Sequence, residues 1–293
     1  MSEPEARGAR AVVELVRAPA ALTVPGDVVA GAAAAGWPFG AATPVLAAAS
    51  AGLYWAGMAL NDYADRDVDA VERPGRPIPS GRVTPRFALG LAAGLTAAGV
   101  GLAGLAGGRR ALGVAVPLAA TVWAYDLVLK GTPAGPVAMA AARGLDVLMG
   151  AGAGRMRRAA PAAALVAAHT LAVTLLSRRE VGGGGPGLPR ATLAATGAIG
   201  AAAGFVQRKG SAPQRLAGAA LLGVYGATFG RAQLAAVRDP GPLPVRRAVG
   251  AGILGLMPLQ AALAAGAGAP AAALPVAAGF PLARRLSRRV SPT

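Results

Sequence analysis

The stretch "LNDYADRDVDAVERPGRPIPSGRV", residues 60–83, places charge between two apolar segments. It holds five of the chain's 13 acidic residues, namely Asp62, Asp65, Asp67, Asp69 and Glu72. Before it runs "AAASAGLYWAGMA" and after it "FALGLAAGLTAAGVGLAGLAG". About 20 largely apolar residues suffice to cross a bilayer. The stretch is therefore predicted to be a polar loop between two membrane helices.

The composition of the whole chain agrees with a membrane protein. Hydrophobic residues make up 54% of the 293 residues, charged residues only 14%, and the mean hydropathy is +0.50. A soluble chain carries about 25% charge. The net charge of +16 raises the possibility of nucleic-acid binding. The basic residues are scattered between apolar segments without interleaved aromatic residues, so we expect no nucleic-acid partner and interpret them as topology determinants.

Apolar runs bounded by Arg, Pro or Gly clusters predict the helices. The candidate spans are 11–35, 43–62, 84–106, 110–128, 133–153, 159–177, 188–206, 213–236, 245–266 and 270–286. The last contains three prolines and is either a span or a re-entrant segment. The expected fold is an all-α polytopic transmembrane bundle of nine or ten helices, with residues 1–293 in one domain. The distribution of Arg and Lys predicts a bacterial-type inner (plasma) membrane protein whose acidic stretch is cytoplasmic. The absence of Cys excludes disulfides, thiolate metal sites and Cys nucleophiles.

The acidic residues have a spacing that suits a cation. If the preceding helix continues past Asn61, Asp65 and Asp69 fall within about 60° of Asp62 on one helical face. Like charges placed so closely cannot all ionise cheaply without cations. Magnesium takes oxygen ligands and is usually bound through few carboxylates together with substrate phosphates.

Two arginines follow the acidic residues in a Pro-broken segment. Arg73 and Arg76 carry the side chain that binds phosphate through two parallel hydrogen bonds. Carboxylates for a metal beside Arg for phosphate are typical of a diphosphate site. The alternative is a solvated loop whose charges compensate one another.

The pattern Asn61-Asp62-x-x-Asp65-x-x-x-Asp69-x-x-x-Arg73-Pro74-x-Arg76-Pro77-Ile78-Pro79-Ser80-Gly81 closely resembles the first aspartate motif of the UbiA family of intramembrane prenyltransferases. Its position after the second predicted helix also fits that family. "LVRAPAALTVPGDVVAG", residues 15–31, looks like the family's first helix. The resemblance extends over the whole chain in architecture but is dense only over residues 61–81.

The resemblance implies a bundle of about nine helices around a lipid-open cavity. There an isoprenyl diphosphate, bound through Mg²⁺, would pass its chain to an aromatic or other lipophilic acceptor. By position, the implied metal ligands are Asn61, Asp62, Asp65, Asp69 and Glu180. The implied substrate-binding residues are Asn61, Arg73, Arg76, Tyr125 and Glu180, and the implied catalytic residues are Asp62, Asp65, Asp69 and Lys130.

The second acidic motif of the family, Asp-x-x-x-Asp-x-x-x-Gly, is only half present. In "LLSRREVGGGG", residues 175–185, Glu180 and Gly184 match its second half, but Leu176 stands where the first Asp is expected. This departure, together with residues 125–152, resembles the EboC-like subgroup of secondary-metabolite clusters. The alternative function is therefore a UbiA-fold protein that binds or transports a lipid or metabolite precursor without prenyl transfer.

Other polar residues in the predicted spans have two interpretations each. Lys130 either meets the diphosphate or lies at the membrane surface as a positive-inside lysine. Asp126, Arg143 and Asp146 lie in or near predicted spans and either form structural pairs or line a polar cavity. Arg143 and Asp146 could pair with each other, because they are three residues apart on one helical face. Asp27 either faces the cavity or caps a break at Pro25. His169 is either a general base or a hydrogen-bonded packing residue.

Overall fold

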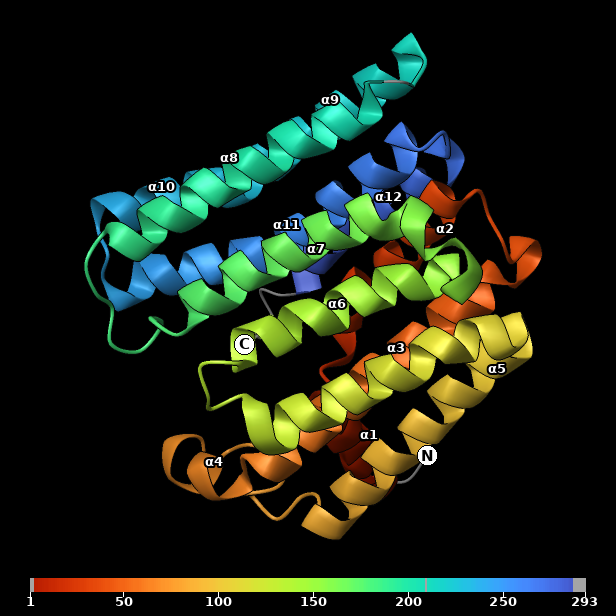
Figure 1. The fold of residues 1–293 in the computed structure, drawn as a ribbon. Helices are drawn as coiled ribbons and strands as arrows, with labels where there is room; N and C mark the ends of the chain where they lie inside the picture. Colours follow the sequence, from red (N-terminus) through yellow and green to blue (C-terminus); the bar gives the residue numbers. More distant parts are fainter. Residues whose placement is uncertain (1–2, 209, 287–293) are drawn as a thin grey trace.

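The computed structural model describes residues 3–208 and 210–286, and the regular secondary structure of this part of the chain is all helical, without strands (Figure 1). The first helices are α1 (Glu3–Leu15), α2 (Pro25–Ala35), α3 (Thr43–Ala64), α4 (Arg66–Glu72), α5 (Pro85–Ala124) and α6 (Gly135–Ala151). The later ones are α7 (Met156–Ser177), α8 (Gly187–Gln207), α9 (Ala212–Tyr225), α10 (Arg231–Arg238), α11 (Pro242–Gly266) and α12 (Pro270–Leu286). Short 3₁₀ or π segments are η1 (Ala18–Thr23), η2 (Gly40–Ala42), η3 (Tyr125–Leu129), η4 (Ala153–Arg155) and η5 (Gly226–Gly230).

The helices have the length and composition of membrane spans. Four helical stretches of the described residues are long and apolar enough to cross a bilayer: Gly40–Ala64, Pro85–Leu129, Ala153–Ser177 and Pro242–Gly266. Ala21–Ala35 is a shorter apolar helix. The expectation of an all-α polytopic membrane bundle is confirmed.

The α5 helix is a hairpin of two limbs rather than one long rod (Figure 1). Gly108 interrupts it with φ 56° and ψ −147°, a conformation that favours glycine. A Cβ placed on Gly104 would lie 3.3 Å from the Leu112 side chain. Eight residues of straight helix would separate the two by about 12 Å, so the chain doubles back. The two spans expected over 84–106 and 110–128 are these limbs.

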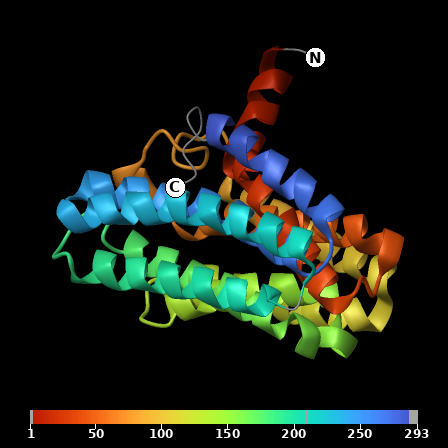
Figure 2. The ribbon, with the colours of Figure 1, turned by 90° about the horizontal axis from the view of Figure 1, so that it is seen from above.

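The first expected span, 11–35, is wrong as a single helix. The chain leaves α1 at Leu15, and Arg17 adopts a left-handed conformation with φ 46° and ψ 49°. The 3₁₀ segment η1 and then α2 follow. Pro25 has no N–H to continue a ladder and instead lies in the first turn of α2. Figure 2 shows the consequence: α1 projects from the bundle while α2 lies within it.

Close packing of α2 against α6 depends on two glycines. A Cβ on Gly31 would lie 1.7 Å from the carbonyl oxygen of Val147, and one on Gly150 would lie 2.1 Å from that of Val28. Small residues allow helix backbones to approach this closely in a membrane. α2 also contacts α3, α7 and α11, so it is an interior helix.

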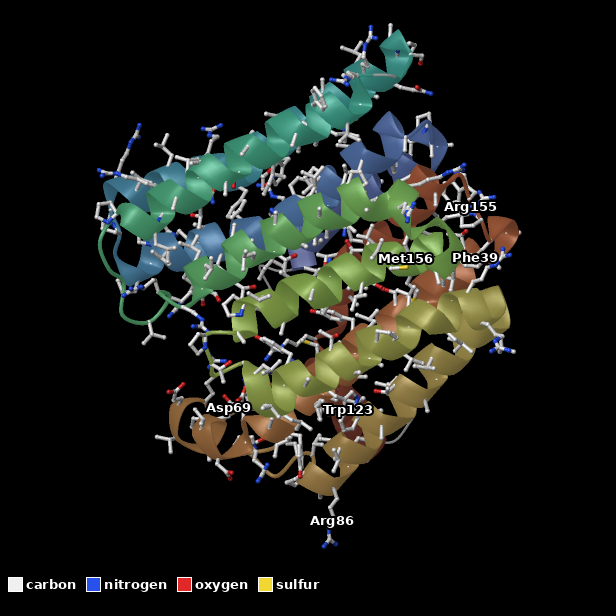
Figure 3. The ribbon with its side chains drawn as sticks, viewed as in Figure 1. Phe39, Asp69, Arg86, Trp123, Arg155 and Met156 are labelled. Atoms are coloured by element: carbon white, nitrogen blue, oxygen red, sulfur yellow. The ribbon has the colours of Figure 1, made fainter. Side chains whose placement is uncertain are left out.

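The acidic stretch lies at one end of the bundle. Figure 3 places Asp69 there and Phe39, Arg155 and Met156 at the opposite end. α3 continues past Asn61, as a shared helical face of the aspartates would require, but only to Ala64. Asp65 then breaks the helix, and the short α4 carries Asp67 and Asp69.

Candidate active site

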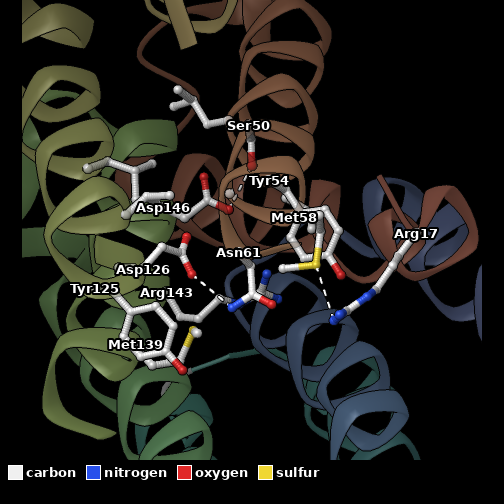
Figure 4. A pocket seen from close by; sticks show the side chains of 16 residues that line it. Arg17, Ser50, Tyr54, Met58, Asn61, Tyr125, Asp126, Met139, Arg143 and Asp146 are labelled. Carbon is white, nitrogen blue, oxygen red and sulfur yellow. Dashed lines mark hydrogen bonds between the residues drawn. The ribbon is translucent and has the colours of Figure 1, made fainter. Parts of the chain in front are cut away.

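A cavity of about 220 Å³ lies between α3, the second limb of α5 and α6 (Figure 4). Its walls are mainly apolar and include Leu53, Leu118, Val122, Met139 and Ala142. Polar residues mark its two ends. The acidic end consists of Arg17, Asn61, Tyr125 and Asp126, and the inner end of Ser50, Arg143 and Asp146. Ser50 and Asn61 both belong to α3, and their eleven-residue separation corresponds to about 16 Å.

At the acidic end, two buried aspartates converge on one guanidinium. Arg76 Nη1 lies 2.9 Å from Asp62 Oδ1 and 3.1 Å from Asp69 Oδ2. Both aspartates are only 4% exposed. Arg17 Nη2 approaches the same Asp62 oxygen at 3.2 Å. Asp67 of the same stretch is exposed. The structure therefore brings Asp62 and Asp69 together across the break at Asp65.

The remaining residues of the first motif are paired with η3 and its flanking residues. Lys130 Nζ lies 2.6 Å from Asp65 Oδ1, and Asn61 Nδ2 donates to Asp126 Oδ1 at 3.1 Å. Tyr125 lines the cavity beside them. Lys130 is thus fixed against a carboxylate at the acidic end rather than being an isolated surface lysine. Asp126, for which the sequence left structural pairing and cavity lining open, lines the cavity as well.

Glu180 of the second motif lies close to the first motif. Burial raises the pKa of Glu180, while the positive charges of Arg246 and Arg73 lower it. Arg73, itself exposed, is therefore near enough to act on Glu180. Leu176 is fully buried among apolar residues that include Val173 and Val249. The position of the missing carboxylate thus faces the core.

The inner end holds a network of buried charges. Arg143 Nη2 lies 2.9 Å from Asp27 Oδ2 and donates to the carbonyl oxygen of Thr23 at 3.0 Å. Gln260 Nε2 donates to Asp27 Oδ1 at 2.7 Å and to the same carbonyl at 2.8 Å. The carbonyl of Thr23 is at the end of η1, where the helical ladder is broken. Arg143 and Gln260 therefore donate hydrogen bonds to a carbonyl group that the break at Pro25 leaves without a helical partner.

Asp146 has a different partner from the one that helical spacing suggested. Ser50 Oγ donates to Asp146 Oδ2 at 2.7 Å, and the direct ion pair of Arg143 is with Asp27. Both Arg143 and Asp146 line the cavity, as the second interpretation of these residues required. Tertiary contacts between helices, rather than the spacing along α6, decide the pairing.

His169 has the contacts of a packing residue. Its Nδ1 lies 3.0 Å from the Tyr225 hydroxyl, and its Nε2 lies 3.0 Å from the carbonyl oxygen of Gly252. The ring is 1% exposed and touches Phe229 edge-on. Its hydrogen-bonded, buried position fits the structural interpretation.

Arg17 is the principal site residue that sequence reasoning missed. It contacts Asp62 and also directs Nη1 toward Met58 Sδ at 3.7 Å, and it lines the cavity (Figure 4). It reaches the site because the left-handed turn at Arg17 folds η1 back beside α3. An arginine within a predicted span was the available signal.

The donor set at the acidic end fits a magnesium ion. Among the described residues, no three His, Cys, Asp or Glu side chains gather closely enough to hold a metal by themselves. Magnesium, however, is usually held by one or two carboxylates together with phosphate oxygens. Asp62 and Asp69 already direct carboxylate oxygens at one positive group.

The family profile described as "UbiA prenyltransferase family" matches residues 22–180, which include both acidic segments and the cavity lining except Arg17. The chain belongs to the UbiA prenyltransferase family. No comparison bears on the EboC-like subgroup, which stays a prediction.

Two curated relatives of this UbiA protein have the same name. A digeranylgeranylglyceryl phosphate synthase of Methanopyrus kandleri is 44% identical over 160 residues, which cover 52% of this chain and 56% of that protein. The enzyme of the same name from Methanothrix thermoacetophila is 44% identical over 95 residues, 32% of this chain and 35% of the relative. The matches thus span about a third to a half of the curated relatives' length.

Solved structures show the same fold at low sequence identity. A UbiA homologue from Aeropyrum pernix K1 has a TM-score of 0.63 and 22% identity, covering 90% of this chain and 97% of the homologue. A structure from a study of digeranylgeranylglyceryl phosphate synthase in membranes also has a TM-score of 0.63, with 17% identity, covering 89% and 98%. These likenesses show the UbiA fold over nearly the whole chain.

Proposed function

We propose that this protein transfers an isoprenyl group, within the membrane, from an isoprenyl diphosphate to an aromatic or other lipophilic acceptor. The observation that carries the proposal is the convergence of Asp62 and Asp69 on a single cation beside an apolar cavity. Family membership supports the same reaction class. The curated relatives are named digeranylgeranylglyceryl phosphate synthase, a name that refers to geranylgeranyl groups. Geranylgeranyl diphosphate is therefore the first donor to test.

The acidic end has the groups needed to hold a diphosphate. Asp62, Asp65 and Asp69 are the proposed magnesium ligands, with Asn61 and Glu180 beside them. A bound magnesium ion would neutralise negative charge on the diphosphate as it leaves. Arg76, Arg17 and Lys130 now neutralise these carboxylates. When the carboxylates bind a metal ion instead, these three positive side chains become available to bind the diphosphate.

The cavity supplies the environment for the reaction. The bond between C1 of the donor and the diphosphate oxygen breaks, and its electron pair leaves with the diphosphate. A nucleophilic atom of the acceptor then forms the new bond to C1 and loses a proton. Apolar walls such as Leu118 and Val122 exclude water from the allylic cation. The predicted cytoplasmic orientation gives the diphosphate access from the aqueous side.

A second function is favoured by the position of Leu176. Because this side chain is fully buried, the second acidic motif offers Glu180 without a facing carboxylate. Arg178 meanwhile donates to the carbonyl oxygen of Thr132, which closes the loop after α7 against the segment after η3. A protein that binds a diphosphate lipid without transferring its chain would have this arrangement.

Binding of geranylgeranyl diphosphate to the purified protein tests the donor site. We expect binding in magnesium that EDTA weakens at least tenfold. Asp62→Ala/Asp65→Ala should abolish the magnesium-dependent part, since it removes two of the proposed ligands. Asp67→Ala is the matched control, because Asp67 belongs to the same stretch but points into solvent.

The outcomes separate the two functions. Magnesium-dependent binding followed by consumption of the donor in an acceptor screen supports the transferase. Magnesium-dependent binding without turnover across that screen supports the binding protein. Equal binding in magnesium and EDTA, or none in folded protein, contradicts both.

A further inference from the structure

A second cavity, of about 520 Å³, lies on the side of the bundle that α9 to α12 form. Its lining comes from η5 and the helices joined to it, from α11 and from α12, and includes Val224, Thr228, Arg231, Leu254, Phe280 and Arg284. We call it the α12 groove. Among the described residues it shares none with the cavity of the candidate active site, so the proposed prenyl transfer does not use it.

The α12 groove has an apolar part and a basic part. Val224 and Arg231 both line it and lie seven residues apart in the run from α9 through η5 to α10. Seven helical residues correspond to about 10 Å. Leu254 of α11 adds to the apolar lining. A ligand that combines a hydrocarbon chain with a charged group would fit both parts.

The basic part points toward the end of the bundle that carries the acidic stretch. From Arg231, α10 continues to Arg238. The carbonyl oxygen of Pro240, two residues later, accepts a hydrogen bond of 3.2 Å from the amide of Gly184. Gly184 belongs to the loop that carries Glu180 of the second acidic motif. Arg231 therefore lies nearer than Val224 to the membrane surface at the acidic end, where lipid headgroups are found.

Thr228 in η5 has a hydroxyl group that the rest of the described chain does not use. In α7, Thr170 and Thr174 each donate to the carbonyl oxygen four residues earlier, the usual partner inside a helix. Thr228 Oγ1 makes no hydrogen bond with any of the described residues. η5 is a π-helical segment, and such segments are frequent at functional sites. The hydroxyl group is thus available to a ligand in the α12 groove.

Two arginines give the groove its positive charge. Arg231 is exposed and forms no ion pair or hydrogen bond with the residues that the structure describes. The guanidinium of Arg284 lies 5.6 Å from the centre of the Phe280 ring, a cation–π contact on the groove wall. No Asp or Glu is among the described residues that line the groove. The charge therefore favours an anion, and Arg binds phosphate oxygens through two parallel hydrogen bonds.

We propose that the α12 groove binds an anionic phospholipid, with its phosphate held by Arg231 and Arg284 and an acyl chain along the apolar part. Thr228 donates its hydroxyl hydrogen to a phosphate oxygen. A zwitterionic phospholipid fits less well, because its ammonium group would meet two arginines and no carboxylate. The lipid comes from the leaflet at the acidic end. This binding site does not depend on the proposed transferase function.

The test compares dioleoyl phosphatidylglycerol with dioleoyl phosphatidylcholine, which share their acyl chains and phosphate and differ in net charge. Native mass spectrometry of the purified protein in detergent measures the dissociation constant of the first bound lipid. We expect phosphatidylglycerol to bind about 25-fold more tightly, or about fivefold for each arginine near the headgroup. The ratio should fall to about fivefold in Arg231→Gln and to about one in Arg231→Gln/Arg284→Gln.

Arg238→Gln/Arg285→Gln is the matched control. It removes the same charge from the same two helices, but both arginines are exposed and neither lines the groove. We expect it to keep the wild-type ratio. Thr228→Val has the shape of threonine without the hydroxyl, so it should weaken both lipids about threefold and leave their ratio unchanged. Inorganic phosphate at the same concentration should not displace the lipid, because it lacks an acyl chain for the apolar part.

Four results would overturn the proposal. They are equal binding of both lipids to the wild type, an unchanged ratio in folded Arg231→Gln/Arg284→Gln, an equal fall of the ratio in the control, and displacement of the lipid by inorganic phosphate. Thermal unfolding in detergent without added lipid checks that the variants are folded.

Binding of geranylgeranyl diphosphate separates this site from the candidate active site. We expect Arg231→Gln/Arg284→Gln to retain the magnesium-dependent binding, and Asp62→Ala/Asp65→Ala to lose it while preserving the lipid ratio. If the wild type binds no diphosphate and the lipid ratio persists, the proposed function is wrong and the lipid site is supported.

Discussion

The two ends of the cavity are both polar, but they are built differently. At the acidic end the charged groups come mostly from one short stretch, residues 61–76, and the cations that neutralise them are partly exposed. At the inner end the groups come from α2, α3, α6 and α11, and every pair crosses between helices. Asp27 is fully buried there, while Asp65, the partner of Lys130 at the acidic end, keeps 32% of its side chain exposed.

The difference indicates what each end can do. An ion pair with a partly exposed carboxylate, such as that of Asp65 with Lys130, can exchange its cation for a metal at modest cost, because water still screens the carboxylate. A charge network enclosed by four helices cannot exchange its partners without leaving a charge unpaired. We therefore expect ligand binding to change the ion pairs of the acidic end. The contacts of the inner end should change only when the packing of its helices changes.

The largest effect is expected from Gly31→Ala, which disturbs the packing of α2 against α6 beside the inner end. The added Cβ would lie 1.7 Å from the carbonyl oxygen of Val147, so α2 and α6 must separate. We expect destabilisation of about 3 kcal/mol or more, at the upper end of overpacking effects. Thermal unfolding in detergent measures it. Gly90→Ala, with no neighbouring atom within 4 Å, is the control and should unfold at or above the wild-type temperature.

Leu176→Asp should be the next most severe change. The substitution restores the residue type of the family's second motif, but at a fully buried position in the core. An unpaired buried carboxylate costs several kcal/mol, so we expect loss of stability without a gain in magnesium-dependent diphosphate binding. Leu176→Met preserves volume and should cost less than about 1.5 kcal/mol. Stronger diphosphate binding in a stable Leu176→Asp protein would show that this position turns toward the site.

Arg76→Gln tests whether the acidic end exchanges its cations. Removing the guanidinium leaves Asp62 and Asp69 facing each other, which should destabilise the protein by about 1–3 kcal/mol in EDTA. Added magnesium should restore a part of the loss in the variant and change the wild type less. Arg66→Gln is the matched control, because the ion pair of Arg66 with Asp67 is exposed. An identical melting shift in EDTA and in magnesium would contradict cation exchange.

Glu180→Gln should have the smallest effect, and its sign depends on pH. Burial raises the pKa of Glu180, so the folded state prefers the protonated acid. The stability this contributes is present below the ordinary pKa of about 4.3 and is lost as pH rises through the raised value. Gln keeps the neutral form at all pH values. We therefore expect the variant and the wild type to have the same stability near pH 4. At pH 7 the variant should have a slightly higher melting temperature, which corresponds to a gain of less than about 1 kcal/mol in the free energy of unfolding.

Melting curves in EDTA across this pH range measure the difference. Glu72→Gln, at the exposed end of α4, is the control. A variant that melts lower than the wild type at pH 7 would show that the ionised Glu180 is stabilised by Arg73 and Arg246 more than burial opposes it.

The sequence by itself determined the class of fold and the acidic end of the cavity. Apolar runs long enough to cross a bilayer fix the helices, because unsatisfied backbone is too costly in lipid. The proximity of Asp62 and Asp69 could be predicted because these residues are neighbours along the chain, although the helix expected to carry both ends at Ala64. The break near Gly108 could be predicted for a different reason, because polar and small residues interrupt the apolar run there.

Only the tertiary structure decided the inner end and the role of Arg17. Asp27 meets Gln260 across 233 residues, and Ser50 meets Asp146 across 96. No local spacing encodes such distances, so the helical rule paired Arg143 with Asp146 when Asp27 holds it instead. The left-handed turn at Arg17 likewise depends on how η1 packs against α3, because an arginine has no intrinsic preference for that conformation. Contacts within a segment follow from its periodicity, whereas contacts between segments depend on which helices pack together.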